Sequence, residues 1–345
     1  MNAPFELRFR RCVFFMRKIR REDIYMLLSY EEFKERVMNE FIDYLPEKYS
    51  DCKLELHQVP KLNEVLTGIA IKPKKPCKSF IAPTFYMERL YAQYEESGSF
   101  EQTMAEQAVY LEESIKFIPK NILSLDFSKV KEKIVFQVIN TAENIEMIAR
   151  CPHRSFEDLS VVYRAITGIT SNGVSGFLIT NDIAAAEGLT EEELYECAYK
   201  NTRKLFPFKS ERIEVMMRRL MRKWGADETE IKEAFPGYTK TPEKERIYVV
   251  TNRHDFFGAN ALLYNDVIGE IAEKIGTDCY ILPSSVHDLI VLSADTYLKE
   301  SKLANIVKTT NSESVRHSER LSDSVYLFSL SSRNISRAAI EEDVS

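Results

Sequence analysis

The chain has 345 residues, of which 44% are hydrophobic and 29% charged, the composition of an ordinary soluble globular protein. Its net charge of −6 argues against a surface that attracts nucleic acid everywhere, although a local basic patch remains compatible with it. No stretch approaches the roughly 20 apolar residues of a membrane-spanning helix, and the scattered cysteines, with no CxxC pair, predict a reduced, cytoplasmic protein.

Residues 1–25 form a basic arm. Only one acid, Glu6, precedes residue 22, whereas this segment carries the cations Arg8, Arg10, Arg11, Arg17, Lys18, Arg20 and Arg21. The apolar run Cys12–Met16 is too short for the core of a signal peptide. Such an arm can bind nucleic acid or a membrane, but charged termini are more often solvated tails. We therefore expect residues 1–25 to lie outside the fold.

Residues 26–150 are expected to form a helix-rich part with one β-hairpin. Ser29 and Glu32 match a capping box at the start of a helix. The alternating segment Lys53–His57 and the apolar segment Leu66–Ile71 predict the hairpin.

Apolar residues at helical spacing predict three further helices in this part, from Pro83 to Gly98, around 104–115, and over about 127–149. The apolar face of the last is so wide that we expect this helix to pack on two sides.

Residues 151–330 are expected to form an α/β core. Leu159–Ile166 and Phe177–Thr180 predict two strands joined by a glycine-containing turn. Residues 209–244 look like an insertion that begins with a basic amphipathic helix, and residues 331–345 look like a frayed tail.

The clearest pattern of the chain lies between Glu245 and Asp295. A first strand is followed by the small pair Gly258–Ala259 and a long apolar helix. Two apolar strands come next, Cys279–Leu282 and Leu289–Leu292. Strands and long helices without regular alternation predict an α+β, or irregular α/β, fold, with small mixed sheets flanked by several long helices.

A series of short pieces resembles a known family. The most specific are Thr251-Asn252, Gly258-Ala259 and Pro283-Ser-Ser-Val-His287, and the others include Ala82-Pro-Thr-Phe-Tyr86, Asn140 with Asn144, Asp158-Leu159 and Asn201-Thr202. In this order they resemble domain-of-unknown-function family 5688, an uncharacterised bacterial family, over about residues 29–330. The resemblance implies no established activity, but it implies a domain that starts near residues 26–29.

The segment from Ser284 to Asp288 contains every residue type of a hydrolase triad. In an extended strand, however, Ser285 and His287 lie roughly 6.6–7 Å apart, too far for a nucleophile–base hydrogen bond. No G-x-S-x-G elbow is present either. A turn whose serine hydroxyls, Ser284 and Ser285, bind local backbone amides explains the segment better. The alternative is a hydrolase in which His287 acts with a serine or aspartate partner at the strand ends.

Two Thr-Asn pairs, at 180–181 and 251–252, follow apolar strands. Asparagine is common where a strand ends in a turn, because it tolerates the left-handed conformation. The alternative is a shared ligand pocket at the carboxyl ends of strands, with the candidate residues Asn181, Asn252, His254 and Asp255.

The predicted helix from Ser210 to Trp224 has one apolar face and a basic rim. The cations of the rim are Arg212, Arg218, Arg219, Arg222 and Lys223. Helices of this kind most often pack on their own domain, while the long cationic stems cover the rim. The alternative is a surface that binds a protein or nucleic-acid partner.

Several motifs are absent from the sequence. It contains neither of the glycine-rich phosphate-binding motifs, G-x-x-x-x-G-K-[ST] and G-x-G-x-x-G. It also has no H-E-x-x-H and no Cys/His cluster with zinc spacing, so we expect neither a cofactor nor a metal. We therefore predict a non-catalytic binding or interaction protein. Its partner would be a protein or nucleic acid, bound through the helix at 210–224 or the arm at 1–25.

Overall fold

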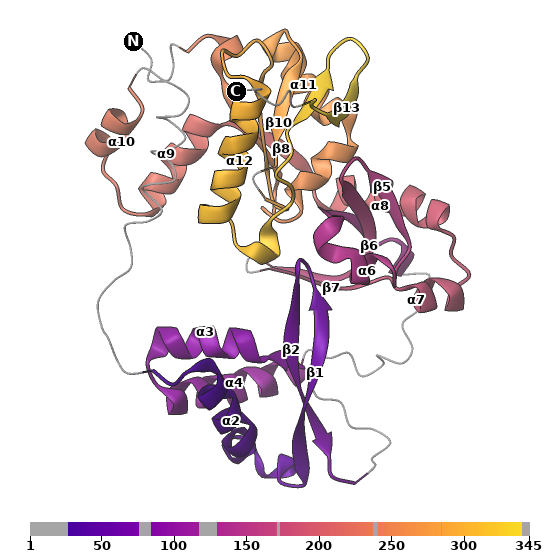
Figure 1. The fold of residues 1–345 in the computed structure, drawn as a ribbon, viewed down its shortest axis with the longest axis vertical. Helices are drawn as coiled ribbons and strands as arrows, with labels where there is room; N and C mark the ends of the chain where they lie inside the picture. The colour runs from indigo at the N-terminus through magenta and orange to yellow at the C-terminus, as the bar shows by residue number, and fades with distance from the viewer. Residues whose placement is uncertain are drawn as a thin grey trace, which may run out of the picture. The chain divides into compact units, whose positions relative to one another are not determined.

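The computed structural model describes residues 27–75, 84–116, 130–170, 173–236, 241–283 and 285–339. These residues fall into two compact units, one within 21–125 and one within 126–345 (Figure 1). Helices flank three sheets whose described strand pairs are antiparallel, so the predicted α+β class is confirmed. Among the described residues, no helix has both the length and the hydropathy that a membrane span requires.

The unit within 21–125 packs helices against a small sheet of order β1-β2-β3. The predicted hairpin is present, and the side chains of Ser29 and Glu32 form the predicted capping box. Its elements are α2 (Tyr30–Glu40), η1 (Phe41–Tyr44), η2 (Glu47–Tyr49), β1 (Cys52–Lys61), β2 (Glu64–Pro73), β3 (Phe85–Tyr86), α3 (Met87–Ser97) and α4 (Phe100–Lys116).

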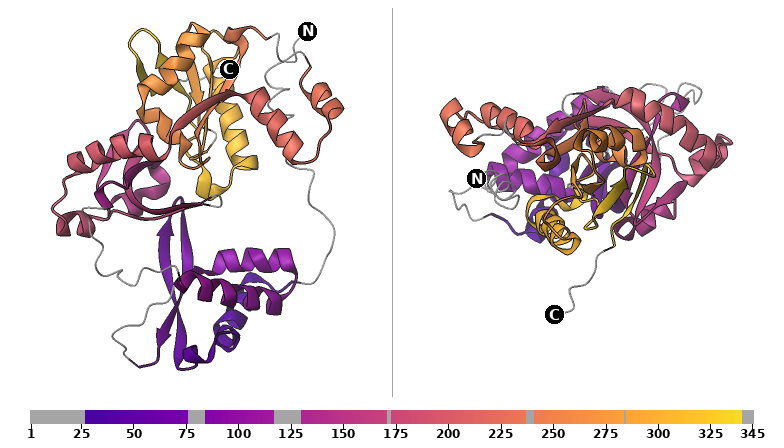
Figure 2. Two further views of the ribbon diagram at one scale, coloured as in Figure 1. Left: turned by 180° about the vertical axis from the view of Figure 1, so that it is seen from behind. Right: turned by 90° about the horizontal axis from the view of Figure 1, so that it is seen from above.

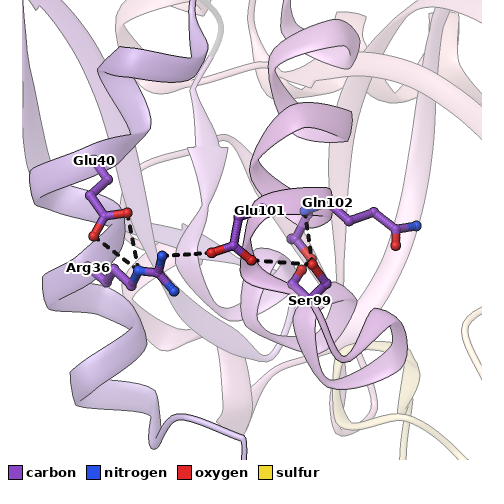
Figure 3. Close-up of polar contacts among 6 residues, drawn as sticks. Arg36, Glu40, Ser99, Glu101 and Gln102 are labelled. Atoms are coloured by element: carbon purple, nitrogen blue, oxygen red, sulfur yellow. Dashed lines mark hydrogen bonds and ion pairs between the residues drawn. The ribbon is translucent and has the colours of Figure 1, made fainter.

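Arg36 ties α2 to the start of α4 in this unit (Figure 3). Its guanidinium donates to Glu40 on its own helix at 3.0 Å and to Glu101 on α4 at 2.8 Å. The same group lies 3.9 Å from the centre of the Phe100 ring, a cation–π contact. The three contacts hold one cation over the aromatic core at this end of the unit.

The unit within 126–345 contains a six-stranded sheet of order β13-β12-β10-β11-β9-β8 (Figures 1 and 2). Its strands are β8 (Phe208–Arg212), β9 (Ile247–Asn252), β10 (Cys279–Leu282), β11 (Leu289–Ser293), β12 (Tyr326–Ser329) and β13 (Asn334–Arg337). Helices α9 (Ile213–Lys223) and α12 (Glu300–Ser314) share one hydrophobic core with one face of the sheet. Helix α11 (Asn265–Ile275) contacts β11 and β12 outside that core.

A second, four-stranded sheet precedes it in the same unit. The long strand β6 (Leu159–Thr170) pairs with β4 (Ile134–Asn140) along one edge and with β5 (His153–Phe156) and β7 (Gly173–Leu178) along the other. Helix α8 (Glu191–Leu205) packs Leu194 and Ala198 against this sheet. The side chains of Thr190 and Glu193 form a capping box at the start of α8. The remaining elements are η4 (Ala142–Asn144), α6 (Ile145–Ile148), α7 (Asn181–Ala186), α10 (Glu228–Ala234) and η6 (Glu243–Glu245).

Side chains provide the hydrogen bonds along the edge of β4 that has no neighbouring strand. Asn260, in the 3-10 helix η7 (Gly258–Leu263), accepts from Val138 N at 3.0 Å and donates to Phe136 O at 2.7 Å. Thr202 on α8 accepts from Phe136 N at 3.1 Å, and Asn201 donates to Ile134 O at 3.0 Å. Asn260 is 1% exposed. Its amide supplies the acceptor and the donor that a neighbouring strand would otherwise provide to these buried backbone groups of β4.

The predicted helix over 127–149 is wrong, because its centre is the strand β4. Six of the seven residues of β4 are buried, on both of its faces. A strand buried on both faces is apolar throughout, so apolar residues also fall at helical spacing and the alternation typical of a half-exposed strand is lost.

Three further boundaries differ from the prediction. The part predicted to end at residue 150 ends by residue 125, and residues 126–150 belong to the other unit. Residues 209–244 are not a separate insertion, because β8 pairs with β9 and the basic helix begins at Ile213 instead of Ser210. The tail predicted to fray after Ser331 contains β13, which pairs with β12. The basic arm at 1–25 lies outside the described residues, so its place relative to the fold stays a prediction.

Candidate functional site

The most specific family-like pieces meet at one edge of the six-stranded sheet. Strand β9 ends and the antiparallel β11 begins there, so the loop 253–257 and the turn 283–288 are neighbours. Thr251 Oγ1 donates to His287 O at 2.8 Å. A Cβ placed on Gly258 would lie 2.1 Å from the same oxygen, so the two backbones touch. Only glycine permits this approach.

The polar side chains of the turn mainly bind backbone atoms. Ser285 Oγ accepts from His287 N at 2.9 Å, which closes a local turn. The imidazole of His287 accepts weakly from Phe257 N at 3.4 Å and lies 3.9 Å from Glu319 Oε1. Among the described residues, no hydroxyl or thiol is within hydrogen-bond distance of that imidazole; Ser284 lies outside them.

Burial controls the charges at this edge. It lowers the pKa of His287, although the nearby Glu319 partly opposes this effect, so the imidazole is neutral at pH 7. Asp288 is only partly buried as a residue, but its carboxyl group is enclosed. This burial, together with Asp255 and Glu319, raises the pKa of Asp288 to about 6.

Replacing Asp288 with asparagine is expected to change how stability depends on pH. The folded chain holds the Asp288 proton up to about pH 6, whereas an unfolded aspartate releases it near pH 4. The unfolding free energy of the wild type should therefore fall as the pH rises from about 4 to about 6, by about 2–3 kcal/mol from this group. Urea unfolding at several pH values measures the effect. The two proteins would show parallel curves over that range if the carboxyl group were solvated.

The structure does not gather the four predicted ligand-binding residues into one pocket. Asn181 follows β7 of the four-stranded sheet, and its side chain donates to Ala149 O at 3.3 Å. Asn252 ends β9 of the other sheet, where it is fully buried, donates to Phe256 O and accepts from His254 N at 2.9 Å. Asp255 pairs with Lys209 at 2.9 Å. The Asn252 contacts shape the turn after β9, whereas Asn181 and Asp255 contact neighbouring segments of the chain.

The basic helix packs on its own unit. Ile213 and Met217 belong to the core beside the six-stranded sheet, while Trp224 is 46% exposed at the end of the helix. Three of the predicted surface cations have acidic neighbours: Arg219 pairs with Glu211, and Arg218 and Arg222 pair with Glu228. Arg212 lies at the end of β8, before the helix starts. Three of the five cations of the basic rim are therefore paired locally, with two glutamates between them.

A pocket that we did not predict from the sequence lies in the same unit. It has a volume of about 430 Å³. It lies among the end of β4, the turn between β5 and β6, the last turns of α12 and the segment after η8 (His317–Glu319). Its wall consists of Asn140, Glu143, Asp158, Lys308, Asn311, Ser312, His317, Arg320, Leu321, Ser322, Asp323 and Ser324.

Asp158, in the turn between β5 and β6, is the most constrained charge of this pocket. Its carboxylate accepts from Ser322 Oγ at 2.6 Å, Tyr326 OH at 2.7 Å and Ser324 Oγ at 3.0 Å. Burial alone would raise the pKa of Asp158, but these hydrogen bonds outweigh it and lower the pKa below its ordinary value. The group is thus ionised at neutral pH.

Side chains also fix the loop that closes the pocket. Asn140 Nδ2 donates to Leu321 O at 2.9 Å, and Asn311 Nδ2 donates to Ser322 O at 2.8 Å and to Asp323 Oδ1 at 2.9 Å. Such contacts make the pocket preformed. No local motif marks it, because Asp158 and its partners are separated by 164 to 168 residues in sequence. Of the family-like pieces, those at Asn140 and Asp158 contribute residues to the pocket wall.

Comparison with curated proteins and with solved structures finds no match to the chain. A family model does match, over residues 30–330. This range includes both the turn around His287 and every residue of the pocket wall, and it confirms the resemblance seen in the sequence. The chain belongs to the Family of unknown function (DUF5688).

Proposed function

We propose that the protein is a non-catalytic, cytosolic binding protein and that it binds a small ligand in the pocket beside Asp158. The observation that carries the proposal is the pocket itself, whose polar wall is fixed by hydrogen bonds before any ligand arrives. Its volume lies within the range of about 300–1,000 Å³ that is typical of small-molecule sites. The free thiols among the described cysteines suit a reducing compartment.

Two other candidate sites have less support. A second hollow, of about 620 Å³, runs past Ser210, Arg212 and Tyr248, but it is a shallow depression on the surface of β8. The arginines of α9 have glutamate neighbours, which weakens the case for a nucleic-acid or protein partner on that helix. The pocket beside Asp158 is both preformed and recessed.

Native mass spectrometry of the protein after incubation with a bacterial metabolite extract tests the proposal. The wild type is expected to retain a small molecule. Ser312, an exposed residue of the pocket wall on α12, is the position to block: Ser312→Trp should abolish retention without disturbing the core. The matched control is Asn305→Trp, because Asn305 is exposed on the same helix but does not line the pocket. Equal retention by all three proteins, or none by the wild type, would refute the proposed function.

Replacing His287 with alanine separates this proposal from the hydrolase alternative. The imidazole makes one weak hydrogen bond in a turn, so we expect a loss of about 1–2 kcal/mol in stability and unchanged retention of the ligand. Hydrolysis of p-nitrophenyl acetate and p-nitrophenyl phosphate is the second readout. Turnover by the wild type that disappears in a folded His287→Ala protein would restore the hydrolase.

A further inference from the structure

We infer that the ligand of the pocket beside Asp158 is a small organic cation, an amine or a guanidinium compound. This inference rests on the proposed function and specifies the ligand class for the same site. It follows from the charges of the wall, from the kind of hydrogen-bonding groups left over, and from the helix end that lies there.

The first step concerns the carboxylates. The wall contains Glu143, Asp158 and Asp323, and Asp158 is ionised although it is partly buried. Among the described residues, no cation forms an ion pair with Asp158; its partners are three neutral hydroxyls. A carboxylate oxygen can accept more than one hydrogen bond, so the group can still receive N–H donors from a ligand. An ammonium or guanidinium group would supply both these donors and the missing positive charge.

The second step concerns Asn311, which is 2% exposed. Its Nδ2 donates twice within the pocket wall, whereas its Oδ1 is buried without a hydrogen-bond partner among the described residues. A buried acceptor without a partner costs about 1–3 kcal/mol. The buried group without a partner beside the carboxylates is thus an acceptor, which agrees with a ligand rich in donors.

The third step concerns the cations of the wall. Arg320 donates to Val315 O at 3.2 Å and to Ser312 O at 3.4 Å, so its guanidinium caps the carboxyl end of α12. The Nε2 atom of His317 lies 3.7 Å from Glu143 Oε2, and the side chain of Lys308 is exposed. The carboxyl end of a helix also carries a partial negative charge. The wall thus carries three carboxylates, Glu143, Asp158 and Asp323, against the two permanent cations Lys308 and Arg320, and this balance favours a cation over an anion.

The ligand is expected to be organic and not a metal ion. Among the described residues, no group of three or more histidine, cysteine, aspartate or glutamate side chains is arranged to hold a metal. The pocket of about 430 Å³ is also far larger than a single ion. Several N–H donors on a carbon frame would reach Asp158 and fill more of that space.

Isothermal titration calorimetry with agmatine, putrescine and spermidine tests the inference, with succinate and inorganic phosphate as anionic counterparts. At least one amine should bind the wild type, more weakly at high salt, and neither anion should bind. Asp158→Asn is expected to weaken binding tenfold or more, because the ion pair with the ligand is lost.

Two further variants keep the test decisive if Asp158→Asn fails to fold. Asp323 is exposed on the pocket wall, so Asp323→Asn should fold normally and still weaken the amine severalfold. Glu270 is an exposed acid on α11 outside the pocket, and Glu270→Gln should bind as the wild type does.

Several results would overturn the inference: no amine binds, an anion binds instead, or Asp323→Asn and Glu270→Gln bind amines equally well. Binding of an arginine-rich peptide without binding of agmatine would assign the site to a protein segment. A retained metabolite that is anionic, and is lost in Ser312→Trp, would refute the cation but leave the proposed function standing. Absence of any retained metabolite would refute the proposed function.

Discussion

Replacing Asn260 with leucine is expected to lower the free energy of unfolding by about 4 kcal/mol. The substitution keeps the approximate size of the side chain but leaves two buried backbone groups of β4, Val138 N–H and Phe136 C=O, without the amide that pairs with them. Each unsatisfied group costs about 1–3 kcal/mol. Urea unfolding measures the loss. Asn305→Leu, at an exposed position of α12, is the control and should change stability by less than about 0.5 kcal/mol. Similar midpoints for the two variants would show that water or a shifted backbone completes the edge of β4.

Replacing Gly258 with alanine should lower the unfolding free energy by about 3 kcal/mol, and replacing it with valine should cost more. The new Cβ would lie 2.1 Å from His287 O and 2.7 Å from Thr251 Cα, and these are backbone atoms that only a shift of β9 or of the turn can move. Gly173→Ala is the matched control, because a Cβ at Gly173 meets nothing within 4 Å. The thermal midpoint of each variant measures the effect. A Gly258→Ala protein as stable as Gly173→Ala would mean that the two strand ends are free to separate.

The segment 247–292 was predictable because each of its elements carries a strong local signal. Short apolar strands bounded by turn residues and one amphipathic helix appear in the structure as β9, α11, β10 and β11. Strand β4 was mistaken for a helix because it is buried on both faces. Strand β13 was missed because Asn334–Arg337 is short and mostly exposed, so its residues show no apolar pattern.

The candidate pocket could not be predicted from local patterns, for a different reason. A single aspartate after a strand is an ordinary turn residue, and serines before a strand are equally common in loops. Their meeting depends on how the four-stranded and six-stranded sheets of this unit pack together, which brings Asp158 to Ser322 and Tyr326. The same holds for Asn260, whose role appears only when the edge of β4 is in place. In contrast, the triad-like residue types around His287 are adjacent in the sequence, so the pattern can be recognised without the structure.

Amide hydrogen exchange with and without the retained ligand tests the central claim most directly, because it locates the ligand on the chain. Binding at the proposed pocket predicts slower exchange in the residues of its wall, within 140–144, 157–159 and 308–324. Peptides from β1 and β2, in the other unit, should be unchanged. Protection confined to the loop 253–257 and the turn 285–288, with none in 308–314 or 157–159, would contradict the account and move the site to His287.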